Sequence, residues 1–154
     1  KMVAAMKKLL KRLDTEDDQA DGVFSIFDKW LDEDEAREAL MSYCNVVSFD
    51  EYDRIKKIER QYLELVVDLS RTCEVQLLQH SHRKAKNDTA SFNDLYSSVS
   101  RYVNHDKSFE IYLQDMEALV AFGYDFTALL YVSDTNVVDN VRGVFLRNGF
   151  HELK

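Results

Sequence analysis

The stretch SFDEYDRIKKIERQYLELVVDLSRTCEVQLLQHSH, residues 48–82, has the strongest pattern in the sequence and decides the predicted fold. Its apolar residues recur three and four positions apart, which is the spacing of one helix face. These residues are Ile55, Ile58, Tyr62, Leu65, Val66, Leu69, Cys73 and Leu77. Ser48 is a suitable N-cap, because Glu51 follows three positions later as in a capping box. We therefore expect one long helix over about 49–82, the spine of a bundle.

Shorter stripes of the same kind lie on both sides of this segment. They predict helices over residues 2–13, 24–31, 33–43, 92–103, 108–122 and 136–147. The chain has no proline, so nothing of that kind interrupts a helix interior. Residues 128–132 are apolar throughout, and so short a run fits a buried strand as well as a helix end. We expect an all-α fold, a multi-helix bundle of five to seven helices around one long central helix, with room for one short β element.

The length of 154 residues fits one domain with its own core. We expect a single helical domain over residues 1–154. In it, an acidic helical part, 1–48, packs on a bundle formed by 49–154.

Charge is unevenly distributed along the chain. The net charge is −8, but residues 14–53 hold fourteen acidic residues against Lys29 and Arg37, which leaves the remainder of the chain basic. A net negative charge disfavours nonspecific binding to nucleic acid, which requires neutralised phosphates. An acidic segment on a basic body indicates a basic protein partner, a cation, or a role in solubility.

The cysteines and glycines exclude several classes of protein. Cys44 and Cys73 lie in no CxxC pair, so we expect no disulfide framework and place the protein in the reducing cytoplasm. The four glycines form neither a GxGxxG nor a Walker A run, which excludes a glycine-rich phosphate loop. No apolar run reaches about 18 residues, so we expect no membrane span, and we see no signal peptide.

One acidic segment, residues 17–28, has the spacing of a metal loop. Its candidate oxygen ligands alternate along the chain, as a calcium ion with six to eight oxygen ligands requires. These ligands are Asp17, Gln19, Asp21, the Val23 carbonyl and Asp28. With Gly22 at the sixth position and Phe24 at the eighth, the segment resembles an EF-hand calcium loop. That resemblance implies calcium as a ligand, with a helix on each side.

Residues 47–52 resemble the end of a second such loop. The residues before them, 40–45, supply no acidic ligands, so this half would be vestigial. In that arrangement Val23-Phe24 and Val46-Val47 would pair as the short β-link of an EF-hand pair.

Catalytic signatures are missing from the sequence. No serine lies in GxSxG, and the four histidines include no pair four positions apart that would suit zinc on a helix. The leading hypothesis is therefore a non-enzymatic, acidic helical protein-protein interaction module: an adaptor, inhibitor or immunity-type protein. The alternative is a calcium-responsive EF-hand-like domain, and the third is an enzyme of unknown reaction. No cofactor other than calcium is indicated.

Calcium binding is expected to be weak. Asp28 is one methylene shorter than the Glu that closes an EF-hand loop, so it supplies two oxygens less readily. We predict an affinity no better than about 10⁻⁴ M, the weak end of known sites. Calorimetric titration of the chain and of Asp17→Ala measures this. Micromolar binding that Asp17→Ala abolishes would make calcium response the leading function.

Overall fold

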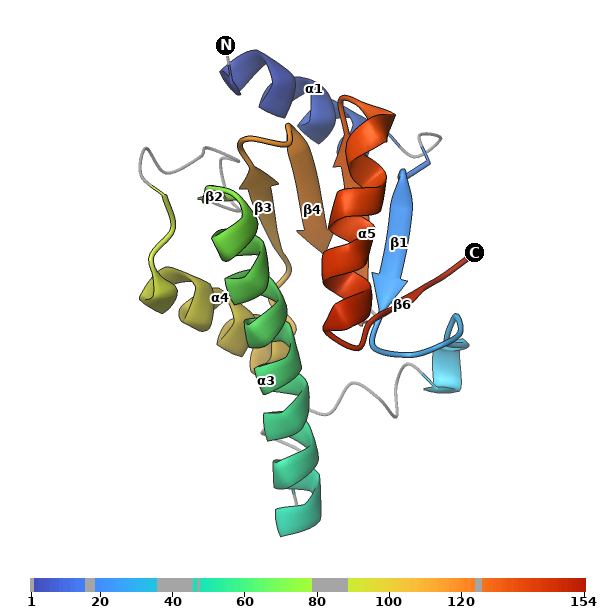
Figure 1. Cartoon of the computed structure of the whole chain (residues 1–154). Helices are drawn as coiled ribbons and strands as arrows, with labels where there is room; N and C mark the ends of the chain where they lie inside the picture. The colour runs from blue at the N-terminus through green and yellow to red at the C-terminus, as the bar shows by residue number, and fades with distance from the viewer. Residues whose placement is uncertain (1, 16–18, 36–45, 47, 79–88, 124–125) are drawn as a thin grey trace.

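The computed structural model describes residues 2–15, 19–35, 46, 48–78, 89–123 and 126–154, with backbone alone for residues 2 and 3. Figure 1 shows the arrangement of the elements. In chain order they are α1 (Met2–Asp14), β1 (Gly22–Ser25), α3 (Phe49–Thr72), β2 (Val75–Leu78), α4 (Phe92–His105), β3 (Phe109–Leu113), β4 (Ala118–Phe122), β5 (Thr127–Val132), the 3-10 helix η3 (Thr135–Val137), α5 (Val138–Arg147) and β6 (His151–Glu152).

The strands of the described residues form one sheet in the order β2-β3-β4-β5-β1-β6, and all neighbours are antiparallel. Strands β3, β4 and β5 follow one another along the chain and pair in that order, in registers such as Ile111 opposite Val120 and Val120 opposite Leu130. Strand β1 comes from the N-terminal third, yet it lies between β5 and β6. The sheet is therefore completed by pairing between distant parts of the sequence.

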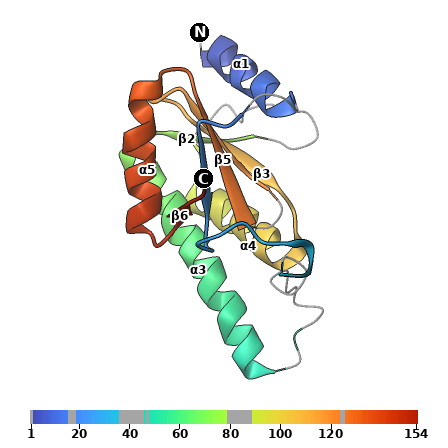
Figure 2. The ribbon, with the colours of Figure 1, turned by 90° about the vertical axis from the view of Figure 1, so that its right-hand side faces the viewer.

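Helices cover both faces of the sheet (Figure 2). Helices α3, α4 and α5 pack on one face, and α1 packs across β4 and β5 on the other. Because side chains alternate along a strand, each strand contributes to both layers. On β3, Ile111 belongs to the core under α3 and α4, whereas Tyr112 contacts the layer that holds α1.

The all-α prediction is wrong: the fold is mixed α/β, with a six-stranded antiparallel sheet among the described residues. The predicted helix over 108–122 is the β3–β4 hairpin, in which FEIYL and ALVAF are buried at every position. A strand covered on both faces is nearly continuous in apolar residues and shows little alternation; Glu110 is the one charged residue in these two strands. Such runs carry no periodic signal that separates strand from helix. Residues 128–132, for which the sequence left strand and helix end open, form strand β5 (Thr127–Val132).

Helix α3 confirms part of the prediction for 49–82. It starts where expected, and the Ser48 hydroxyl accepts a hydrogen bond from the Glu51 amide. Val66, Leu69 and Cys73, which belong to the apolar stripe of this segment, are buried. The helix ends at Thr72, however, because the next segment pairs with β3 as the fully buried strand β2.

The N-terminal third differs from the expectation in one element. The segment predicted as a helix over 24–31 begins with strand β1 and is not helical. Residues 33–35 are helical, and the Asp32 carboxylate caps them by accepting from the Glu35 amide, while residues 36–45 lie outside the described chain.

Three other helix predictions are confirmed with small shifts. They are those over 2–13, 92–103 and 136–147, the last of which is η3 followed by α5. Helix α5 stops before Asn148-Gly149, as expected, and Gly149 has a φ of 82° that favours glycine. None of the described helices combines the length and the apolar character that crossing a membrane requires.

Replacing the buried Leu69 tests the packing of α3 on the sheet. Its side chain has no exposed surface, so Leu69→Ala leaves a cavity as well as losing apolar burial. We expect the free energy of unfolding to fall by about 2–5 kcal/mol, measured by urea denaturation. The exposed Leu146→Ala, a control of the same chemistry on α5, is expected to change it far less.

Candidate functional site

The residues of the predicted calcium loop take part in other interactions. Asp21 accepts hydrogen bonds from the Arg12 guanidinium, at 2.8 Å, and from the Val132 amide, at 2.8 Å. The Val23 carbonyl accepts from the Leu153 amide, and the Gln19 carbonyl accepts from Arg12. The structure thus joins Asp21 and Gln19 through Arg12.

The other two predicted ligands add little to a metal site. Asp28 is exposed beyond β1, and Asp17 lies outside the described residues. Val47, half of the predicted β-link, lies outside them too; in the structure, β1 pairs with β5 and β6. Within the described ranges, no three His, Cys, Asp or Glu side chains are grouped to hold a metal ion. Calcium binding stays a prediction.

Reactive side chains offer no catalytic arrangement in the described chain. Burial raises the pKa of the Cys73 thiol to about 11, so it is protonated and unreactive at neutral pH. His105 and His151 are exposed on separate elements, while Cys44, His80 and His82 lie outside the described residues.

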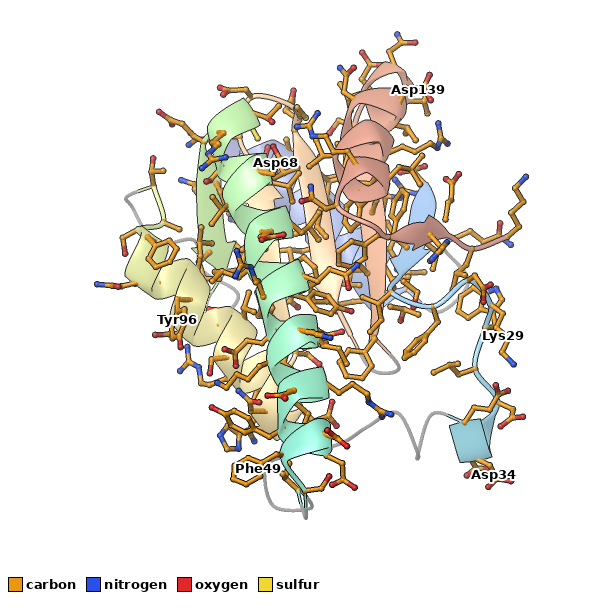
Figure 3. The ribbon with its side chains drawn as sticks, turned by 60° about the horizontal axis from the view of Figure 1, so that its bottom comes forward. Lys29, Asp34, Phe49, Asp68, Tyr96 and Asp139 are labelled. Carbon is orange, nitrogen blue, oxygen red and sulfur yellow. The ribbon has the colours of Figure 1, made fainter. Side chains whose placement is uncertain are left out.

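A shallow groove of about 620 Å³ runs along the outward surface of α3. Phe92 of α4 borders one side and Asn148, just after α5, borders the other; the remaining lining residues are Arg60, Leu63, Glu64, Val67, Asp68 and Arg71. Their spacing of three and four positions puts them on one face of α3. In Figure 3, Asp68 marks this face near α5, and Tyr96 projects from α4 on the opposite side.

The charged side of the groove is held by ion pairs. Arg147 binds both Asp68 oxygens, at 2.7 and 2.8 Å, and Asn148 donates a further bond to the same carboxylate. These hydrogen bonds, Arg147 first, lower the pKa of Asp68 to about 2, so it stays ionised and cannot exchange protons near neutral pH. Arg60 pairs with Glu64.

Arg71 differs from the other two arginines. Its charge acts on Asp68, but in the described part of the chain its guanidinium forms no hydrogen bond. Its side chain is exposed at the groove. Arg71 is therefore a cation available to an incoming anion.

The opposite side of the groove is apolar. Leu63 and Val67 are half-buried, and Phe92 is 58% exposed and packs beside Tyr96, with ring centroids 6.2 Å apart. An arrangement of apolar surface, an ionised Asp68 and the exposed Arg71 suits binding rather than proton transfer.

Two acidic segments, which we together call the acidic end, carry exposed aromatic rings: residues 28–35 after β1, where the Trp30 indole donates to the Lys154 carbonyl, and the first turn of α3, which projects beyond the sheet (Figure 1). Its aromatic residues are Trp30, 54% exposed, Phe49, 88% exposed, and Tyr52. Its acidic residues are Asp28, Asp32, Glu33, Asp34, Glu35, Asp50, Glu51 and Asp53. In Figure 3, Phe49 lies at the free end of α3, and Asp34 lies apart from it on the segment after β1.

Sequence reasoning located the acidity of this end but missed the groove. The Arg147–Asp68 pair joins residues 79 positions apart, and no local pattern marks such a contact. Phe92 is an apolar residue at the start of the predicted helix over 92–103, yet its side chain is 58% exposed. A comparison of the chain with models of known protein families, with curated proteins and with solved structures finds no match.

The ion pair between Asp68 and Arg147 predicts how the stability of the folded chain depends on pH. The folded-state pKa of about 2 lies below the value of about 3.9 for an unfolded chain. The stabilisation is therefore complete above about pH 4 and is lost as the pH falls toward 2. We expect Asp68→Asn to be less stable than the parent chain at pH 6, and the difference in urea midpoint to shrink toward zero near pH 2. A difference that stays constant over this range would contradict the assigned ion pair.

Proposed function

We propose that this chain is a non-enzymatic protein-protein interaction module that binds a basic partner through its acidic end. The observation that carries the proposal is the exposure of Trp30 and Phe49 among acidic side chains. Exposed aromatic residues supply much of the binding energy at protein interfaces. The surrounding carboxylates favour lysine and arginine on the partner and speed its approach.

The fold supports presentation of this surface. Ile55 is the first buried residue of α3, so the turn that holds Phe49 and Tyr52 stands clear of the core. The same helix is anchored farther along by Tyr62, Leu65 and Leu69, which have no exposed surface. A rigid helix end with exposed aromatic residues loses little conformational freedom on binding.

Selection from a random 12-residue peptide library displayed on phage tests this proposal. We expect peptides rich in lysine, arginine and apolar residues to be recovered on the immobilised chain. On the Trp30→Ala/Phe49→Ala double variant, recovery should fall at least tenfold, the effect of losing about 1.4 kcal/mol of binding energy.

The matched control is Phe92→Ala, which removes an exposed ring elsewhere on the molecule. It should leave recovery of the basic peptides unchanged. Recovery of no basic peptides, or equal recovery on the double variant, would rule out the acidic end as the binding surface.

A further inference from the structure

We infer a second binding surface on this molecule: the α3 groove takes an amphipathic helical segment of a partner protein, with its apolar side on Leu63, Val67 and Phe92 and an acidic residue at Arg71. This goes beyond the proposed function, since the groove is a different surface and selects the opposite charge.

The shape of the groove matches a helix rather than a compact ligand. Its α3 residues run from Arg60 to Arg71, which at about 1.5 Å per residue spans about 17 Å, or three helical turns. A partner helix of about 11 residues covers that length. Amphipathic helices commonly bind by placing anchors three and four positions apart into such a groove.

One side of the groove is apolar and the other is charged, and this difference sets the orientation of the partner helix. Leu63, Val67 and Phe92 form the α4 side, so the apolar anchors of the partner lie there. Tyr96 extends this apolar side, because its ring packs beside Phe92.

Charge identifies the polar side of the partner. The groove holds three arginines near it, of which Arg60 is paired with Glu64 and Arg147 with Asp68. Arg71 forms no hydrogen bond within the described residues, so it is the arginine of the groove whose guanidinium is left to pair with an incoming anion. A carboxylate of the partner pairs with it, whereas a lysine there meets like charge. The net charge of −8 opposes binding of a second copy of this chain.

A focused peptide library tests the inference. Its members are 12-residue peptides with leucine or phenylalanine fixed at positions 2, 5, 6 and 9, and with four other positions varied among Glu, Lys and Ser. Displayed on phage and selected on the immobilised full chain, the Glu-bearing class should be recovered. Recovery of that class should fall at least tenfold on Arg71→Glu and at least tenfold on Phe92→Ala.

Arg101→Glu is the matched control, because it makes the same charge change at an exposed site of α4 outside the groove. Recovery on this variant should equal that on the parent chain. Trp30→Ala/Phe49→Ala should also leave the Glu-bearing class unchanged while reducing the Lys-bearing class, so the two proposals fail separately. Circular dichroism verifies that each variant is folded.

Three results would overturn the inference. One is failure to recover the Glu-bearing class on the parent chain. Another is equal loss on Arg101→Glu and Arg71→Glu, which would show a general charge effect. The third is a dimer in sedimentation velocity that Arg71→Glu dissociates, which would assign the groove to self-association.

Discussion

The packing of Tyr62 against rings from four other segments is the constraint that orders this molecule. Its ring lies 5.2 Å from that of Tyr102 on α4 and 5.1 Å from that of Phe150 after α5, and it also meets Phe122 and Phe126. Its hydroxyl donates to the Phe126 carbonyl, which satisfies the polar end of a side chain with no exposed surface. One residue of α3 thereby fixes α4, the sheet and the chain after α5. Both surfaces on α3, the groove and the acidic end, take their positions from this contact.

The sequence predicted α1, α4, α5 and the start of α3 because each of these helices has one solvent-exposed face and one buried face. Helix α3 is the clearest case, since its buried and exposed residues alternate with the helical period as far as Thr72. The sheet was missed for the opposite reason. Strands β3 and β4 are buried on both faces, so ALVAF is apolar throughout and FEIYL holds a single charged residue, Glu110. Residues 108–122 therefore fit a helical template equally well.

The surfaces were predictable only in part. The acidity of residues 14–53 is a property of composition, and the structure places its described members at α1, on the segment after β1 and in the first turn of α3. The groove depends on contacts such as Arg147 with Asp68 and Gln61 with the Asn148 carbonyl, which exist only once α5 lies beside α3. The calcium-loop spacing illustrates the reverse case. Asp21 sits at a ligand position in the pattern, but in the fold its carboxylate joins α1 to β5 through Arg12 and Val132.

The position of β1 between β5 and β6 also governs how the chain comes together. The Asp21 carboxylate accepts a hydrogen bond from the amide of Val132, which lies 111 positions later in the sequence. The Val23 carbonyl accepts a hydrogen bond from the amide of Leu153. During synthesis, α1 and β1 leave the ribosome long before the strands that receive them. The apolar side chains of Leu9 and Phe24, buried in the finished fold, have no sheet to cover them during that interval. Because these contacts span so much of the sequence, we expect the closing of the sheet to be a late and slow step of folding, before which this apolar surface is exposed to aggregation.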